Sequence, residues 1–151
     1  MTDHLEIVMD PLPPDGLARL INEGVDLHNV AITGVAEWYA ANFFLRSRDG
    51  EWMGGLLGGI WGGWLHVRSL WVASAARGKG HGGRLLDAAE AFAITRGCGA
   101  STLETHNPLA LRFYERRGYV EFGRLTDYPP GHVKVYLRKT LPPAPPSSVG
   151  R

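Results

Sequence analysis

A glycine-rich segment between an expected strand and an expected helix carries the clearest chemical signal in this sequence. Residues 77–83, here named the glycine loop, read Arg-Gly-Lys-Gly-His-Gly-Gly. Unpaired backbone N–H groups at a helix start favour an anion, and glycines let that anion approach the main chain closely. Arg77, Lys79 and Arg84 add positive charge. The loop therefore predicts a pyrophosphate site, and the alternative interpretation is a solvated connector.

The glycine loop departs from two common nucleotide-binding motifs. A P-loop ends in Gly-Lys-Ser or Gly-Lys-Thr, whereas Lys79 is followed by Gly80 and His81. The dinucleotide motif Gly-x-Gly-x-x-Gly fails because Leu85 stands three residues after Gly82. We therefore expect a phosphate-bearing ligand of another kind.

Two motifs in the chain are similar to those of a known enzyme family. The first is Arg-x-x-Gly-x-Gly at Arg77, Gly80 and Gly82, directly after the expected strand end Leu70-Trp71-Val72. The second follows the pattern Asn-x-x-Ala-x-x-Phe-Tyr-Glu-x-x-Gly-Phe, at Asn107, Ala110, Phe113, Tyr114, Glu115, Gly118 and Tyr119. On these residues the chain resembles the GNAT superfamily of N-acetyltransferases over about residues 43–141.

The resemblance implies that acetyl-CoA is the acetyl donor, and it assigns residues to this cosubstrate. The main chain of the strand end would pair with the pantetheine arm like an added strand, and the glycine loop would hold the pyrophosphate. The implied binding residues are Leu70, Trp71, Val72, Arg77, Gly78, Lys79, Gly80, His81, Gly82, Gly83 and Asn107. If the resemblance is set aside, the sequence pattern assigns the side chains of Leu70, Trp71 and Val72 to the core and makes Asn107 a helix cap.

The resemblance also implies the residues that move protons. Tyr114 is the expected general acid that protonates the departing CoA thiolate, although a buried aromatic residue is the plainer reading. Family members that use a strand glutamate as base have it eleven positions before the signature, where this chain has His66. An imidazole is an adequate base near neutral pH, so His66 is a possible general base. Glu104 is the reserve candidate, and Glu51 or a water relay remain open.

The implied reaction is acetyl transfer to a primary amine by direct attack within a ternary complex. The acceptor is a small-molecule or peptide amine that the sequence does not identify. Cys98 follows Gly97 far from both motifs, so we expect no acyl-cysteine intermediate. Two alternatives remain open: a non-catalytic acetyl-CoA sensor, and an interaction module whose five tryptophans form a dimer or partner surface. A homodimer is possible in either case.

Composition limits the classes to which the chain can belong. Its 151 residues suit one domain, and sixteen basic against fifteen acidic residues disfavour a nucleic-acid partner. The longest apolar stretch, residues 53–65, is too short and too glycine-rich to span a bilayer, so no membrane partner is expected. The single Cys98 suggests a cytoplasmic protein, and six scattered histidines predict no metal site.

The elements that must position these residues follow from hydrophobic patterning and turn signals. We expect a strand at 5–9, one or two helices within 15–29, a hairpin of 40–48 with 51–61, and a second hairpin at Gly62-Gly63. The strand 64–72 should carry a bulge between Val67 and Leu70, where the alternation breaks. A helix to Gly97, a strand at 100–105, a helix from Asn107 to Gly118 and a last hairpin around Pro130-Gly131 complete the pattern.

This order of elements predicts a mixed α/β fold. The resemblance specifies it as a GNAT-like central sheet, mostly antiparallel and partly splayed, with helices on its faces. We assign residues 1–141 to a single domain of this kind and the Pro- and Ser-rich residues 142–151 to a flexible tail.

Overall fold

The computed structural model describes residues 5–146, which fall into two compact units that divide between Ala36 and Glu37. The first contains one helix, α1 (Asp15–Thr33), which Gly34 ends in a left-handed conformation with φ 72°. One continuous helix thus extends past the expected range 15–29. The strand predicted at 5–9 is wrong, because this segment is exposed and no strand pairs with it.

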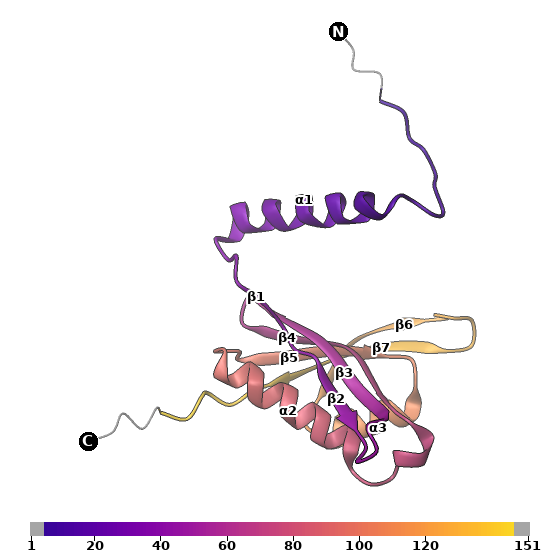
Figure 1. Cartoon of the computed structure of the whole chain (residues 1–151), viewed down its shortest axis with the longest axis vertical. Coiled ribbons are helices and arrows are strands. Elements are labelled where there is room, and N and C mark those ends of the chain that lie inside the picture. Colours follow the sequence, from indigo (N-terminus) through magenta and orange to yellow (C-terminus); the bar gives the residue numbers. More distant parts are fainter. Residues whose placement is uncertain (1–4, 147–151) are drawn as a thin grey trace. The chain divides into compact units, whose positions relative to one another are not determined.

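The second unit is built around one twisted sheet (Figure 1). Its strands are β1 (Trp38–Ala40), β2 (Phe43–Arg46), β3 (Trp52–Trp61), β4 (Trp64–Val72), β5 (Ala100–Thr105), β6 (Val120–Thr126) and β7 (Val133–Thr140). The spatial order is β1-β3-β4-β5-β7-β6, and β2 also pairs with β3. Among the described strands only β4 and β5 run parallel. The mixed α/β fold with a mostly antiparallel sheet is confirmed.

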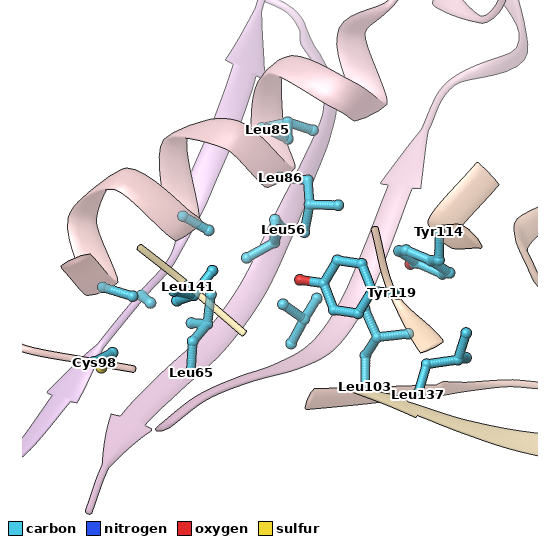
Figure 2. Packing of buried hydrophobic residues seen from close by; sticks show 14 of the residues in the cluster. Leu56, Leu65, Leu85, Leu86, Cys98, Leu103, Tyr114, Tyr119, Leu137 and Leu141 are labelled. Atoms are coloured by element: carbon cyan, nitrogen blue, oxygen red, sulfur yellow. The ribbon is translucent and has the colours of Figure 1, made fainter. Parts of the chain in front are cut away.

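Two helices and a short 3-10 turn complete this unit. The turn η1 (Ser74–Ala76) follows β4, α2 (His81–Thr95) packs on β2, β3 and β4, and α3 (Pro108–Arg116) packs on β5. Their apolar side chains join those of the sheet in a single core cluster (Figure 2). Fully buried members include Leu56, Leu65, Leu86, Leu103 and Leu137. The two helices therefore cover the same face, and the opposite face, which no described helix of this unit covers, is named here the exposed face.

A bulge in β4 keeps its aliphatic side chains in the core. Leu57 pairs with Ser69 while Gly58 pairs with Val67, so Arg68 is the extra residue. Without it, the side chains after Val67 would switch faces, because strand side chains alternate with a period of two. The bulge lies where the broken alternation predicts it, and Leu65, Val67, Leu70 and Val72 all join the core cluster.

The turns confirm most of the expected hairpins. Gly62 and Gly63 have φ of 59° and 80°, and Gly131 has φ 78° in a turn that the His132 N–H closes onto the Pro129 carbonyl oxygen at 2.9 Å. The strand expected over 40–48 is interrupted, because the Asn42 side chain accepts a hydrogen bond from the Gly58 N–H and separates β1 from β2.

Candidate active site

The glycine loop leads into α2 as the sequence predicts. Gly80 is the N-cap residue with φ 79°, and no side chain caps the helix. The first hydrogen bond of the helix runs from the Arg84 N–H to the Gly80 carbonyl oxygen at 3.1 Å. The preceding N–H groups, of His81, Gly82 and Gly83, therefore stand free of main-chain and side-chain partners within residues 5–146. Such a row of bare amides is suited to an anion.

The space beside these amides is open. A Cβ atom added at Gly78 or Gly80 would meet no heavy atom within 4 Å, and the φ values of 74° and 79° disfavour any other residue there. Lys79 forms no ion pair with a described residue. A hollow of about 590 Å³ adjoins the helix start, with Arg46, His81 and Arg84 among its lining residues. Geometry and charge both fit a diphosphate.

Arg77 has a structural contact in addition to its charge. Its Nε donates a hydrogen bond of 2.7 Å to the Val72 carbonyl oxygen, which ties the glycine loop to the end of β4. The loop conformation therefore depends partly on this side chain.

The strands β4 and β5 diverge next to the glycine loop, and this opening is named here the fork. Their last paired residues are Val67 and Leu103, although β4 continues to Val72 and β5 to Thr105. The family resemblance implies a partly splayed sheet, and the fork is where the splaying occurs. Main-chain groups of β4 beyond the last pair lack a neighbouring strand on the β5 side.

The pairing of β4 with β3 decides which main-chain groups face the fork. The Ala73 N–H donates to the Met53 carbonyl oxygen, and hydrogen-bonded pairs alternate along an antiparallel ladder. The main chain of Trp71 therefore points to Gly55 on β3, whereas Leu70 and Val72 point toward the fork. Of the three residues assigned to the pantetheine arm, only these two face the fork: Leu70 can offer its N–H and C=O groups to an added strand, and Val72 its N–H, because the Val72 carbonyl oxygen accepts from Arg77 Nε.

The two candidate bases lie together at the fork. Nε2 of His66 is 3.3 Å from Oε2 of Glu104, and their side chains are 46% and 33% exposed. His66 lies one residue before the last paired residue of β4, and Glu104 one residue after that of β5. Both side chains are on the exposed face, since Val67 and Leu103 beside them are in the core. His66 and Glu104 therefore form a pair, whereas the sequence analysis treats them as alternative candidates for the general base.

Tyr114 and Asn107 are both on α3. Asn107 caps the helix, because its Oδ1 accepts a hydrogen bond of 2.9 Å from the Leu109 N–H and Pro108 occupies the first turn. Tyr114 is 7% exposed, and burial raises the pKa of its phenol. No residue in 5–146 forms a hydrogen bond with its hydroxyl group. The phenol therefore stays protonated at neutral pH and is free to donate.

Contacts from α3 fix the start of α2. A Cβ atom at Gly82 would lie 3.8 Å from the Phe113 ring. Arg117 Nη2 donates to the Gly83 carbonyl oxygen at 2.9 Å and to Asp87 Oδ1 at 2.5 Å. A Cβ atom at Gly83 would be 2.6 Å from this guanidinium, so a larger residue there would displace the Arg117 side chain from its contacts. Gly82 and Gly83 thus serve helix packing as well as the bare amides.

A buried polar network beneath Tyr114 was not predicted from the sequence. The Tyr119 hydroxyl lies 2.8 Å from Ser101 Oγ and donates to Glu90 Oε1 at 2.9 Å, and Lys139 Nζ donates to Glu90 Oε2 at 2.7 Å. Burial is the main reason that the pKa of Tyr119 is raised far above its usual value. The tyrosine rings meet edge to face at 5.7 Å (Figure 2). A glutamate on the apolar stripe of α2 was the signal that could have revealed this network.

A separate cavity lies on another side of α3. It measures about 280 Å³ and is lined by Thr105, His106, Asn107, Gly131 and His132, among others. The last hairpin therefore borders a cavity that reaches Asn107, but neither His66, Glu104 nor the glycine loop lines it.

Two further findings concern expected absences. Within residues 5–146, no three His, Cys, Asp or Glu side chains are arranged so that they could hold a metal ion. The helices of this described part are too short or too polar to cross a membrane.

Comparison with known proteins defines the class to which this fold and site belong. Residues 17–119 match the acetyltransferase (GNAT) family, and the chain belongs to it. The chain is 36% identical over 121 residues to acetyltransferase Atu2258 of Agrobacterium fabrum, which covers 80% of this chain and 88% of that protein. Over 93 residues it is 46% identical to a blasticidin-S acetyltransferase of Streptomyces morookaense, covering 61% and 68%.

Solved structures agree with the sequence relatives. The crystal structure of a candidate acetyltransferase from Agrobacterium tumefaciens superposes with a TM-score of 0.85 at 33% identity, covering 91% of this chain and all of that one. The resemblance seen in the two motifs is thereby confirmed at the level of family and fold. The roles of individual residues stay predictions.

Proposed function

We propose that this protein transfers an acetyl group from acetyl-CoA to a primary amine by direct attack in a ternary complex. The observation that carries the proposal is the fork: bare amides of α2 lie beside it, and His66 and Glu104 lie at it on the exposed face. Two substrates that approach this opening from opposite faces of the sheet would meet between the strands.

On the donor side, the chain supplies main-chain contacts. The amides of His81, Gly82 and Gly83 would bind the diphosphate, with Lys79 as a counter-charge. The main chain of Leu70 and the N–H of Val72 would pair with the pantetheine arm, because these groups point toward the fork and the Val72 carbonyl oxygen is held by Arg77. Asn107, at the start of α3, would contact the same arm from the side of β5.

On the acceptor side, proton transfer falls to His66 and Glu104. An amine is mostly protonated near neutral pH, so a proton must leave the nitrogen before or as it attacks the acetyl carbon. His66 would accept this proton, and Glu104 at 3.3 Å would stabilise the resulting imidazolium. As the carbon–nitrogen bond forms and the carbon–sulfur bond breaks, the Tyr114 phenol would give its proton to the departing thiolate.

A small-molecule amine is the acceptor class that we favour over a peptide. Its support is the relative named for blasticidin S, which is 46% identical over a 93-residue stretch. We also propose, on the sequence alone, that the protein is cytoplasmic and that it forms a homodimer.

The proposal is tested first by cosubstrate binding. Calorimetry should show that acetyl-CoA binds the wild-type protein, and that Gly80→Val weakens this binding at least tenfold, because a side chain at φ 79° distorts the loop and fills the space above the amides. Gly99→Val is the matched control, since Gly99 also has no neighbour within 4 Å but lies far from the loop and has no positive φ.

Turnover is tested by release of free thiol from acetyl-CoA across a panel of amines. Transfer to at least one amine is the expected result. Binding without thiol release on any amine would favour a non-catalytic sensor. Absence of both binding and a thermal shift with acetyl-CoA would favour an interaction module and overturn the proposal.

A further inference from the structure

A cavity on the exposed face is lined by three of the five tryptophans. Trp38, Trp61 and Trp64 surround a space of about 340 Å³, together with Gly59, His66, Arg68 and Thr102. The lining includes His66, the candidate base, so any molecule in this space lies against the group that would take its proton. We name this space the indole cavity.

The backbone beneath the indole cavity is adapted to flat rings. Trp38 lies over Gly59, where an added Cβ atom would be 3.0 Å from the indole Nε1 and 3.1 Å from Cζ2. Trp61 and Trp64 pair directly across the Gly62-Gly63 turn, so their side chains leave the sheet on one face. Walls of this kind favour a planar aromatic or heteroaromatic ring, which can stack on indoles.

Arg68 gives the indole cavity its charge. It is the extra residue of the bulge in β4, and its side chain lines the cavity with those of Trp64 and His66. Within residues 5–146, Arg68 forms no ion pair and no hydrogen bond through its side chain. A guanidinium group binds a carboxylate through two parallel hydrogen bonds, and one without a protein partner is available for a ligand.

We propose that the indole cavity selects an acceptor that carries a planar aromatic ring and a carboxylate in addition to its amine. The ring stacks against the tryptophans, the carboxylate pairs with Arg68, and the amine faces His66. This inference rests on the proposed function for the identity of the amine as the attacking group. The ring and carboxylate contacts concern binding alone.

The test compares three probes that differ by one group each. Phenylalanine has ring, carboxylate and amine, 2-phenylethylamine lacks the carboxylate, and leucine lacks the ring. Quenching of tryptophan fluorescence reports binding without any turnover. We expect phenylalanine to bind about tenfold more tightly than either other probe, the scale of one charge-assisted contact or one stacked ring.

Variants assign this preference to the cavity. Arg68→Gln should make phenylalanine and 2-phenylethylamine bind equally, and Arg68→Lys should restore part of the difference. Gly59→Val should displace the Trp38 indole and abolish the preference for a ring, with thermal unfolding as the check on folding. Arg138→Gln is the matched control. Arg138 is on the same face, with its Cζ 5.9 Å from the centroid of the Phe122 ring, and it does not line the cavity.

The outcomes separate this inference from the proposed function. Equal binding of the probes, no binding of any of them, or a preference unchanged in Arg68→Gln would overturn the inference, even if amines are acetylated. Arg68-dependent binding of phenylalanine without thiol release from acetyl-CoA on any amine would support the cavity assignment and contradict the acetyltransferase activity.

Discussion

Tyr114 and Tyr119, whose rings are in edge-to-face contact, should differ in what removal of the phenolic hydroxyl group changes: turnover for Tyr114 and stability for Tyr119. In Tyr114→Phe, the group removed has no hydrogen-bond partner within residues 5–146, so the free energy of unfolding should change by less than about 0.5 kcal/mol. Turnover should fall by about 10²-fold or more if the phenol is the proton donor, with little change in acetyl-CoA affinity.

Tyr119→Phe should instead destabilise the fold. The change leaves Ser101 Oγ, on a residue with 0% exposure, without its partner, and it removes one of the two donors that Glu90 receives. Each unpaired buried group costs about 1–3 kcal/mol, which gives a total of about 3 kcal/mol. With a urea slope of about 2 kcal/mol/M, the midpoint should move down by roughly 1.5 M. Turnover at a temperature where the variant is folded should change by less than about tenfold.

Urea unfolding followed by circular dichroism, with thiol release under the same buffer, measures both variants. Tyr39→Phe is a control, because its hydroxyl makes only an exposed hydrogen bond of 3.3 Å to Glu37. Ser101→Ala added to Tyr119→Phe should restore part of the stability, since one unpaired group is removed. An unchanged midpoint in Tyr119→Phe, or equal turnover in Tyr114→Phe, would refute the corresponding half of the reasoning.

Three further predictions concern the same site. His66→Gln should lower turnover by about 10²-fold, and Glu104→Gln by less, because the second residue acts through the first; an acetylation rate unaffected by His66→Gln would exclude it as the base. Because burial raises the pKa of Tyr114 above its ordinary value near 10, activity that needs the protonated phenol should persist to pH 10 and fall only above it, and a steady-state pH profile checks this. Cys98 is buried and burial raises the pKa of its thiol, so Cys98→Ala should keep full turnover in the thiol-release assay, whereas complete loss would indicate an acyl-cysteine.

Local patterns were sufficient to predict most elements of the second unit. Asn107-Pro108, Gly62-Gly63 and the terminal Gly97 and Gly118 each act within a few residues, and the structure has the cap, turn and helix ends that they imply. The segment 5–9 failed for the opposite reason. Its apolar residues have the composition of a strand, but a strand also needs a partner, which composition does not supply.

The candidate site was predictable only where one segment makes it. The glycine loop could be recognised because the residues that supply its amides and charges are contiguous in the sequence. The His66–Glu104 pair required the parallel register of β4 and β5, across 38 residues of sequence. The network at Glu90 joins α2, β5, β7 and Tyr119, and the lining of the indole cavity comes from the four strands β1, β3, β4 and β5, so neither leaves a short motif.

The alternation of side chains along β4 has a practical consequence for redesign. Leu65, Val67, Leu70 and Val72 hold the hydrophobic interior, while Trp64, His66 and Arg68 project from the other side of the same ribbon. Libraries that randomise Trp38 and Arg68 therefore change the lining of the indole cavity without replacing a residue of the core cluster.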